Sequence, residues 1–92
     1  MTSDISGAMG TPSPDVLVAH LAGEAVLLNL SDKRYYRLNE SAAFIWKALE
    51  RGESREEILA SIVNEYDIDA ATASDQLSDV VGGLVSKGLL SV

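Results

Sequence analysis

The sequence predicts an α+β domain in which a three-stranded antiparallel sheet is followed by three helices. Between residues 16 and 38, short runs of branched and aromatic side chains alternate with turn-forming residues, which is typical of strands. From residue 39 onward, apolar residues recur every three to four positions, which is typical of amphipathic helices. With 92 residues, of which 47% are hydrophobic, the chain has room for one compact core.

The strand region divides at two turns. Gly23 marks the break between a first strand within residues 16–21 and a second within residues 26–30. The polar stretch 31–33 then favours a turn before a third strand at residues 34–38. These strands form a predicted antiparallel meander.

Each of the three helices has a recognisable start. Asn39 is the expected N-cap of the first, and Ser54 with Glu57 three residues later forms a capping box for the second. Asp69 is expected to cap a third helix that reaches Lys87. The apolar residues expected to face the core are Ala42, Ile45, Trp46, Leu49, Ile58, Leu59, Ile62, Val63, Tyr66, Leu77, Val80, Val81 and Leu84.

The two ends of the chain differ from its middle. Residues 1–14 hold both prolines and several small polar residues without an apolar period, so they are expected to form a flexible N-terminal arm. The domain itself is expected to span residues 15–92, with the apolar tail 89–92 packed as a short strand or cap. Residues 1–14 do not resemble a signal peptide, so a cytoplasmic location is expected.

Composition removes several classes of function. The chain has no cysteine and a single histidine, His20, so it cannot build a zinc site, a thiol nucleophile or a disulfide. Its net charge of −7 disfavours nucleic acid and anionic membranes as partners. No run of apolar residues is long enough for a membrane helix. We therefore expect no catalytic residue, metal or cofactor.

The predicted arrangement is winged-helix-like, and such domains commonly bind DNA through the third helix. Here that helix carries Asp69, Asp75 and Asp79 against one cation, Lys87. A helix that reads a DNA groove needs basic or amide side chains directed at phosphates and bases. DNA binding is therefore the less favoured interpretation.

The one cluster of positive charge lies at the third strand and its turn, at Lys33, Arg34 and Arg37. Charged residues on an exposed edge strand commonly protect a sheet from aggregation, which is one interpretation of the cluster. The same edge also suits the addition of an extended peptide, in which backbone hydrogen bonds supply affinity. The two interpretations are compatible.

The aromatic residues favour structural roles. Because side chains alternate along a strand, Tyr36 shares the face of Leu38, and Tyr35 shares the opposite face with Arg37. Tyr36 is then expected in the core or in a pocket wall. Trp46 lies on the buried stripe of the first helix, where a structural role is favoured over binding.

Several of these features occur in a known order. The run from Ala25 to Leu30, the stretch Arg34-Tyr-Tyr-Arg-Leu-Asn39, Trp46 with Ala42 and Ala43, the Gly52 stop and the closing Lys87-Gly-Leu-Leu resemble the PqqD family. The resemblance spans residues 16–92. The tyrosine pair followed by Leu38 and Asn39 is most similar to the small B1 proteins of lasso-peptide biosynthesis.

This resemblance implies a RiPP recognition element, a non-catalytic domain that binds the leader segment of a precursor peptide. In such domains the leader adds as a strand beside the third strand and lies against the third helix. The matching strand residues are Arg34, Tyr35, Tyr36, Arg37 and Leu38. The expected partners are the precursor peptide and a separate enzyme, the leader protease of a lasso pathway.

The helix face that lines this groove follows from helical geometry. With residues placed about 100° apart, one flank of the third helix carries small neutral side chains that let a peptide backbone approach. This flank is the predicted groove wall, and its residues are Ser74, Ser78, Val81, Gly82 and Val85. The opposite flank offers Gln76, Gly83 and Lys87.

The sequence thus predicts a peptide-binding adaptor that delivers a leader to a modifying enzyme. Two alternatives stay open at this point. The domain would serve a radical enzyme if it were the PQQ-pathway member itself, or it would be a winged-helix module for protein interaction or transcription.

Overall fold

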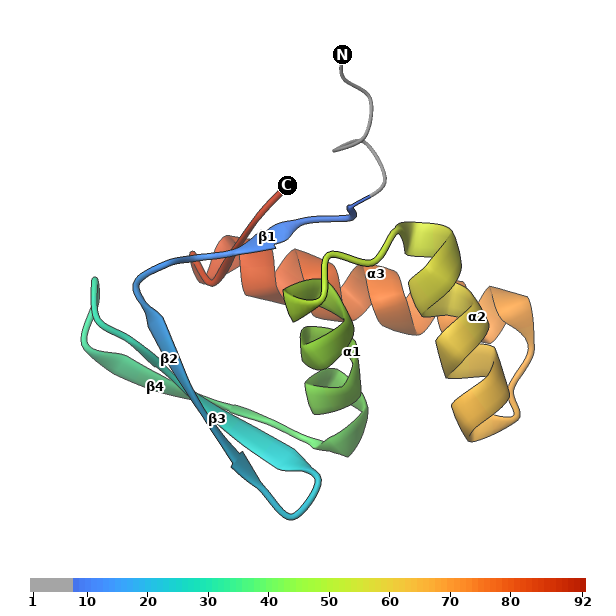
Figure 1. Ribbon diagram of the computed structural model, residues 1–92, viewed down its shortest axis with the longest axis horizontal. Coiled ribbons are helices and arrows are strands. Elements are labelled where there is room, and N and C mark those ends of the chain that lie inside the picture. The colour runs from blue at the N-terminus through green and yellow to red at the C-terminus, as the bar shows by residue number, and fades with distance from the viewer. Residues whose placement is uncertain (1–7) are drawn as a thin grey trace.

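The computed structural model describes residues 8–92 (Figure 1). Its elements in chain order are β1 Thr11–Pro12, β2 Val16–Leu21, β3 Glu24–Asn29, β4 Arg34–Leu38, α1 Glu40–Glu50, α2 Arg55–Tyr66, α3 Ala70–Ser86 and β5 Leu90–Ser91. The predicted α+β class, with a three-stranded antiparallel sheet followed by three helices, is confirmed.

The sheet has the order β2-β3-β4, with both neighbouring pairs antiparallel. Two residues, Ala22 and Gly23, connect β2 to β3, and both have positive φ angles of 48° and 89°. Turns of this kind match the twist of the strands they join. At the next turn the Lys33 N–H donates to the Asn29 carbonyl at 2.7 Å, and Lys33 itself has a φ of 61°.

Side chains cap the helices as the sequence predicts. The Asn39 side chain accepts from the Ala42 N–H at 2.9 Å, at the start of α1. In the capping box of α2, Ser54 accepts from the Glu57 N–H, and Glu57 accepts from the Ser54 N–H at 2.8 Å. Such caps satisfy backbone donors that the first helical turn leaves without partners.

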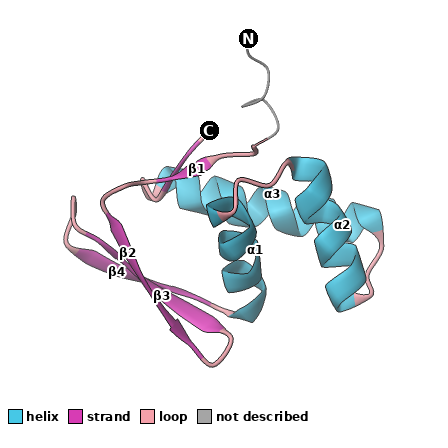
Figure 2. Cartoon of the chain, viewed as in Figure 1, coloured by secondary structure: helices cyan, strands magenta, loops and turns pink. Residues whose placement is uncertain are grey.

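The core lies between the inner face of the sheet and the helices, which gather to one side of the three-stranded sheet in Figure 2. On β3, Ala25 and Leu27 are fully buried, and α1 contributes the buried Trp46. Helix α3 packs along α2 and reaches β5. The large side chains with the least exposure are Trp46, Leu27, Ile45, Leu49, Ile58, Ile62, Leu77 and Leu89.

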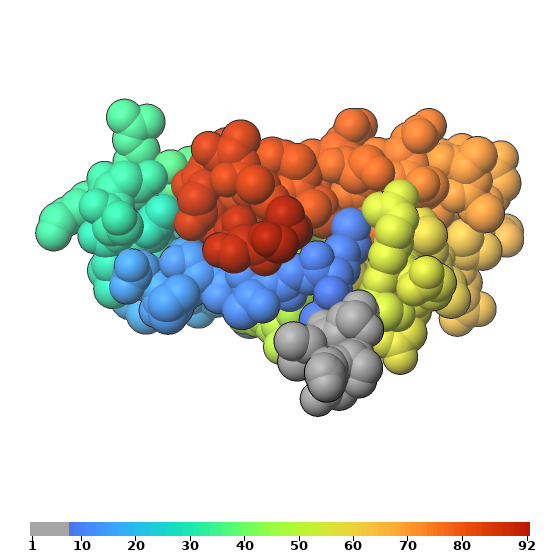
Figure 3. Space-filling model, turned by 90° about the horizontal axis from the view of Figure 1, so that it is seen from above, coloured from blue at the N-terminus to red at the C-terminus, as the bar shows by residue number. Residues whose placement is uncertain are grey.

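The N-terminal boundary differs from the predicted one. Strand β1 pairs with β5, with Thr11 opposite Ser91 and Pro12 opposite Leu90, and Met9 packs against the core. Figure 3 shows these two ends of the chain in contact. Residues 9–14 therefore belong to the domain, and the predicted arm over 1–14 is wrong for them. Of that predicted arm, residues 1–7 lie outside the described part of the chain.

This pairing also explains a close approach at Gly10. A Cβ atom there would lie 3.1 Å from the Ser91 carbonyl oxygen and 3.2 Å from the Leu90 side chain. Proline is tolerated in β1 because the strand pairs on one side only. The predicted packing of the tail as a short strand is confirmed by β5.

Candidate functional site

A cleft of about 410 Å³ separates β4 from α3. One wall is β4 and the other is a stripe of α3, and Ala42 and Leu89 also contribute to the lining. Its lining residues are Tyr35, Tyr36, Arg37, Leu38, Ala42, Asp79, Val80, Gly83, Leu84, Lys87 and Leu89. Most of these residues are aliphatic, aromatic or glycine, so the cleft suits an extended chain with apolar side chains.

The backbone of β4 offers hydrogen-bonding groups to this cleft. Successive residues at the end of β3 direct their backbone groups to opposite sides. The Leu30 N–H donates to the Asp15 carbonyl, on the β2 side, whereas the Asn29 carbonyl accepts from the Lys33 N–H, on the β4 side. The register pairs Leu27 with Tyr36 and Ala25 with Leu38. The backbone groups of Tyr36 and Leu38 therefore bond to β3.

The alternate residues of β4 have the opposite backbone direction. Tyr35 and Arg37 direct their N–H and C=O groups toward the outer edge, where β4 has no partner strand within residues 8–92. An open edge of this kind is a template for another strand. Four backbone groups, two donors and two acceptors, are thus presented beside the cleft.

The side chains of β4 divide between two faces of the sheet, as alternation predicts. Leu38 is buried and Tyr36 is half-buried on the core side. On the other side Tyr35 is 73% exposed. Arg37 also lies there, and its Nη2 contacts the Glu24 carboxylate at 3.0 Å.

A hydrogen bond fixes the tyrosine of the pocket wall. The Tyr36 hydroxyl donates to Asp32 Oδ2 at 2.6 Å, across the turn before β4. This bond raises the pKa of Tyr36 above its usual 10.0, because it favours the protonated phenol. The same bond lowers the pKa of Asp32 below 3.8, because it favours the carboxylate.

The wall from α3 is a single stripe of the helix. Val80, Gly83 and Lys87 recur at the spacing that places helical residues on one face. Gly83 widens the cleft here because it has no side chain. A Cβ atom at this position would meet only the Lys87 ammonium, at 3.7 Å, outside the local helix backbone.

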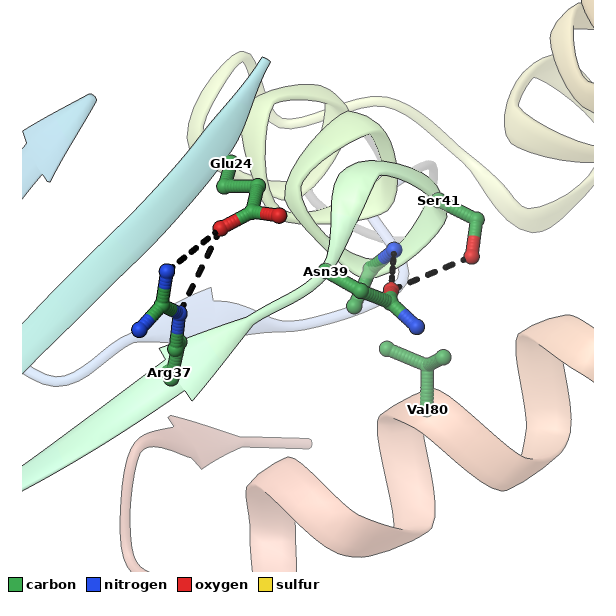
Figure 4. A pocket seen from close by; sticks show the side chains of 6 residues that line it. Glu24, Arg37, Asn39, Ser41 and Val80 are labelled. Atoms are coloured by element: carbon green, nitrogen blue, oxygen red, sulfur yellow. Dashed lines mark hydrogen bonds and ion pairs between the residues drawn. The ribbon is translucent and has the colours of Figure 1, made fainter. Parts of the chain in front are cut away.

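A second, more polar hollow of about 380 Å³ adjoins the cleft (Figure 4). It shares Arg37, Ala42 and Val80 with the cleft and adds Glu24, Asn39 and Ser41. Figure 4 shows the Arg37–Glu24 pair on one side of it and the Asn39 cap on the other. The two hollows together follow β4 to the start of α1.

The helix flank predicted from the sequence lies elsewhere, and its place as the wall of this cleft is corrected. Ser74 and Ser78 accept hydrogen bonds from Arg55 on α2, at 2.7 and 3.3 Å. Val81 is 9% exposed and packs in the core. Gly82 and Val85 are exposed but do not line the cleft beside β4.

The predicted flank does not line the cleft because the open edge of the sheet lies on the other side of α3. Helical periodicity finds the buried stripe of α3 but does not say on which side of that stripe β4 lies. Of the opposite flank, Gly83 and Lys87 line the cleft and Gln76 does not. Asp79 also lines it.

The remaining candidates have structural positions. His20 is exposed on β2, Trp46 is 1% exposed in the core, and Glu57 belongs to the capping box. Within residues 8–92, no three His, Asp or Glu side chains lie close enough together to hold a metal ion. No helix in the same range has the length and apolar character needed to cross a membrane.

Comparisons with known proteins identify the fold and the family. A search of curated proteins gave no match. Among solved structures, the chain is similar to TbiB1 in complex with the TbiA(beta) leader peptide, at 38% identity and a TM-score of 0.83, covering 87% of this chain and 93% of that one. It is also similar to a lasso peptide synthetase B1 complexed with the leader peptide, at 26% identity and a TM-score of 0.84, covering 92% and 100%.

The resemblance read from the sequence is thereby confirmed. The family described as coenzyme PQQ synthesis protein D (PqqD) matches residues 24–90, which is most of the sequence. The chain belongs to the PqqD family.

Proposed function

We propose that this protein is a non-catalytic RiPP recognition element that binds the leader segment of a precursor peptide. The open edge of β4, which faces an apolar cleft against α3, carries this proposal. Both similar solved proteins are complexes with leader peptides, which supports the same ligand class here.

The leader adds as a strand beside β4. Its backbone bonds to the outward groups of Tyr35 and Arg37, in the way that extended peptides join sheet edges. Such bonds contribute affinity regardless of the peptide sequence. Alternate side chains of the leader enter the cleft, where burial of one apolar side chain contributes about 1.5–3 kcal/mol and supplies selectivity.

The bound leader is delivered to a modifying enzyme, the leader protease of a lasso-peptide pathway. The similarity to two B1 proteins favours this partner. A role as peptide chaperone for a radical enzyme is the second candidate, and membership of the PqqD family favours it. A DNA-binding role is disfavoured because Asp75 and Asp79 lie on α3, the helix that would enter a groove.

The leader-binding proposal is tested by fluorescence polarisation. A labelled leader peptide, taken from the precursor encoded beside this protein, is titrated with the purified domain, and a scrambled leader serves as control. Saturable binding at micromolar or tighter affinity is expected for the leader alone. A folded domain that binds neither peptide, or both equally, contradicts the proposal.

Delivery is tested separately by following precursor cleavage by the neighbouring leader protease. We expect the domain to accelerate cleavage of the intact precursor and not of a precursor with a scrambled leader. Equal rates with and without the domain contradict delivery to a protease and leave the radical enzyme as the partner to assay.

A further inference from the structure

Positive charge in this acidic chain is concentrated around β4. The sequence has 7 Lys and Arg residues and a net charge of −7. Lys33 and Arg34 lie at the turn and first residue of β4, Arg37 lies on the strand, and Lys87 lies on the α3 wall. Of the remaining cations, Arg51 pairs with Glu53 and Arg55 bonds to serines of α3.

The Arg37 side chain can contact one side chain of an added strand. Its backbone groups face the open edge, so a leader residue lies directly beside it and on the same face of the sheet. The Arg37 side chain is 77% exposed, and both its Nε and its Nη2 contact a single oxygen, Glu24 Oε1. Its Nη1 makes no hydrogen bond within residues 8–92 and remains available for a second carboxylate.

Tyr35 occupies the equivalent position two residues earlier. It lines both the cleft and a shallow groove of about 220 Å³ on the outer face of the sheet. The groove is otherwise apolar and is formed by Leu17, Val18, Ala19, Val26 and Leu28. An added strand lies on the opposite side of β4 from β3, so a leader side chain beside Tyr35 packs against the exposed ring of Tyr35, with Leu28 on the far side of that ring as its cross-strand neighbour.

We propose that this site selects a leader segment with an acidic residue opposite Arg37 and an apolar residue opposite Tyr35. These two leader residues lie two positions apart and alternate with the residues that enter the cleft. The inference rests on the proposed function and names the chemistry of the segment bound.

The two walls of the cleft explain why the acidic residue belongs on the outer face. On its α3 wall the cleft carries one acidic and one basic side chain, Asp79 and Lys87. On the outer face of the sheet the Arg37 side chain contacts one carboxylate, that of Glu24, whose side chain is 44% exposed. An acidic leader residue would share Arg37 with this carboxylate.

The experiment is a charge-reversal test by fluorescence polarisation with the leader of the precursor encoded beside this protein. An opposite-charge pair on neighbouring strands favours binding by up to about fivefold, and a like-charge pair directly opposite disfavours it. Arg37→Glu is therefore expected to weaken binding by up to about 30-fold. Lys47→Glu makes the same change of net charge at an exposed position on α1 and is expected to leave affinity unchanged.

The matching changes are made in the peptide. Each acidic leader residue is replaced singly by lysine, and one such peptide should bind the unaltered domain weakly and Arg37→Glu well. Glu24→Gln removes the competing carboxylate and should tighten binding of the natural leader. A leader without an acidic residue in its bound segment, or equal weakening by Arg37→Glu and Lys47→Glu, overturns the charge-reading inference. If the unaltered domain binds no leader at all, the proposed function itself fails.

Discussion

Substitutions at the two adjacent glycines of α3 distinguish the helix flank that lines the cleft from the flank that the sequence alone favoured. Gly83 lines the cleft, whereas a Cβ atom added at Gly82 would have open space around it, with no neighbour within 4 Å beyond the local helix backbone. A Cβ atom at either position therefore meets no residue of the core. Gly83→Leu fills part of the cleft, and Gly82→Leu is its matched control.

Both variants are expected to fold with raised stability. Glycine in the interior of a helix is roughly 0.5–1 kcal/mol less favourable than a good helix former such as leucine. For a domain of this size, 1 kcal/mol corresponds to a Tm shift of about 4–8 °C. A rise of about 2–8 °C is expected for each variant by thermal unfolding monitored by circular dichroism.

Their leader affinities should diverge. The leucine side chain at Gly83 occupies space that an apolar leader side chain needs, and excluding one such group loses about 1.5–3 kcal/mol. Gly83→Leu should therefore weaken leader binding by roughly tenfold to hundredfold in fluorescence polarisation. Gly82→Leu should bind as the unaltered domain does.

The opposite pattern would refute the reasoning. If Gly82→Leu weakens binding and Gly83→Leu does not, the leader lies on the flank of Ser78 and Val85. If both variants bind normally with raised Tm, the leader does not enter this cleft.

Three further predictions concern a hydrogen bond beside the cleft, a helix cap and a core residue. A pH titration of phenolate absorbance, compared with Tyr36→Phe, should place the pKa of Tyr36 above 10.0, and Asp32→Asn should return it toward that value. The hydrogen bond from the Tyr36 hydroxyl to Asp32 contributes stability that is present below pH 10 and is lost as pH rises through the raised pKa of Tyr36. The same contribution is lost in acid, as Asp32 is protonated below pH 3.8. Ser54→Ala should lower the free energy of unfolding by about 1 kcal/mol in urea, with little loss of leader affinity. An unchanged urea midpoint would show that the capping box does not stabilise the domain. Leu27→Ala, at a fully buried position of β3, should cost about 2–5 kcal/mol by the same assay, and a cost below about 1 kcal/mol would contradict the assigned core.

Local signals account for the parts of the fold that the sequence predicts correctly. Asn39, Ser54 and Asp69 each accept a hydrogen bond from a backbone N–H three residues later, which depends only on neighbours in the chain. The alternation of Tyr35 and Tyr36 likewise follows from strand geometry alone. Elements fixed by short-range chemistry are therefore readable from the sequence.

The errors arise where distant segments meet. Strand β1 has only two residues, and its partner β5 lies near the other end of the sequence, so no local pattern predicts that the two strands pair. The predicted helix flank does not line the cleft for a similar reason, because the lining depends on where β4 passes α3. The bond from Tyr36 to Asp32 was missed although both residues lie within one hairpin, and their spacing across the turn was the available signal.

Amide hydrogen exchange measured by NMR, with and without the leader, tests the central claim most directly. Strand addition to β4 predicts that the amides of Tyr35 and Arg37 become strongly protected on binding, while those of Tyr36 and Leu38 are protected already by β3. Protection of Val18 and His20 instead would place the leader on the outer edge of β2. Saturated binding with no new protection at Tyr35 and Arg37 would contradict strand addition to β4.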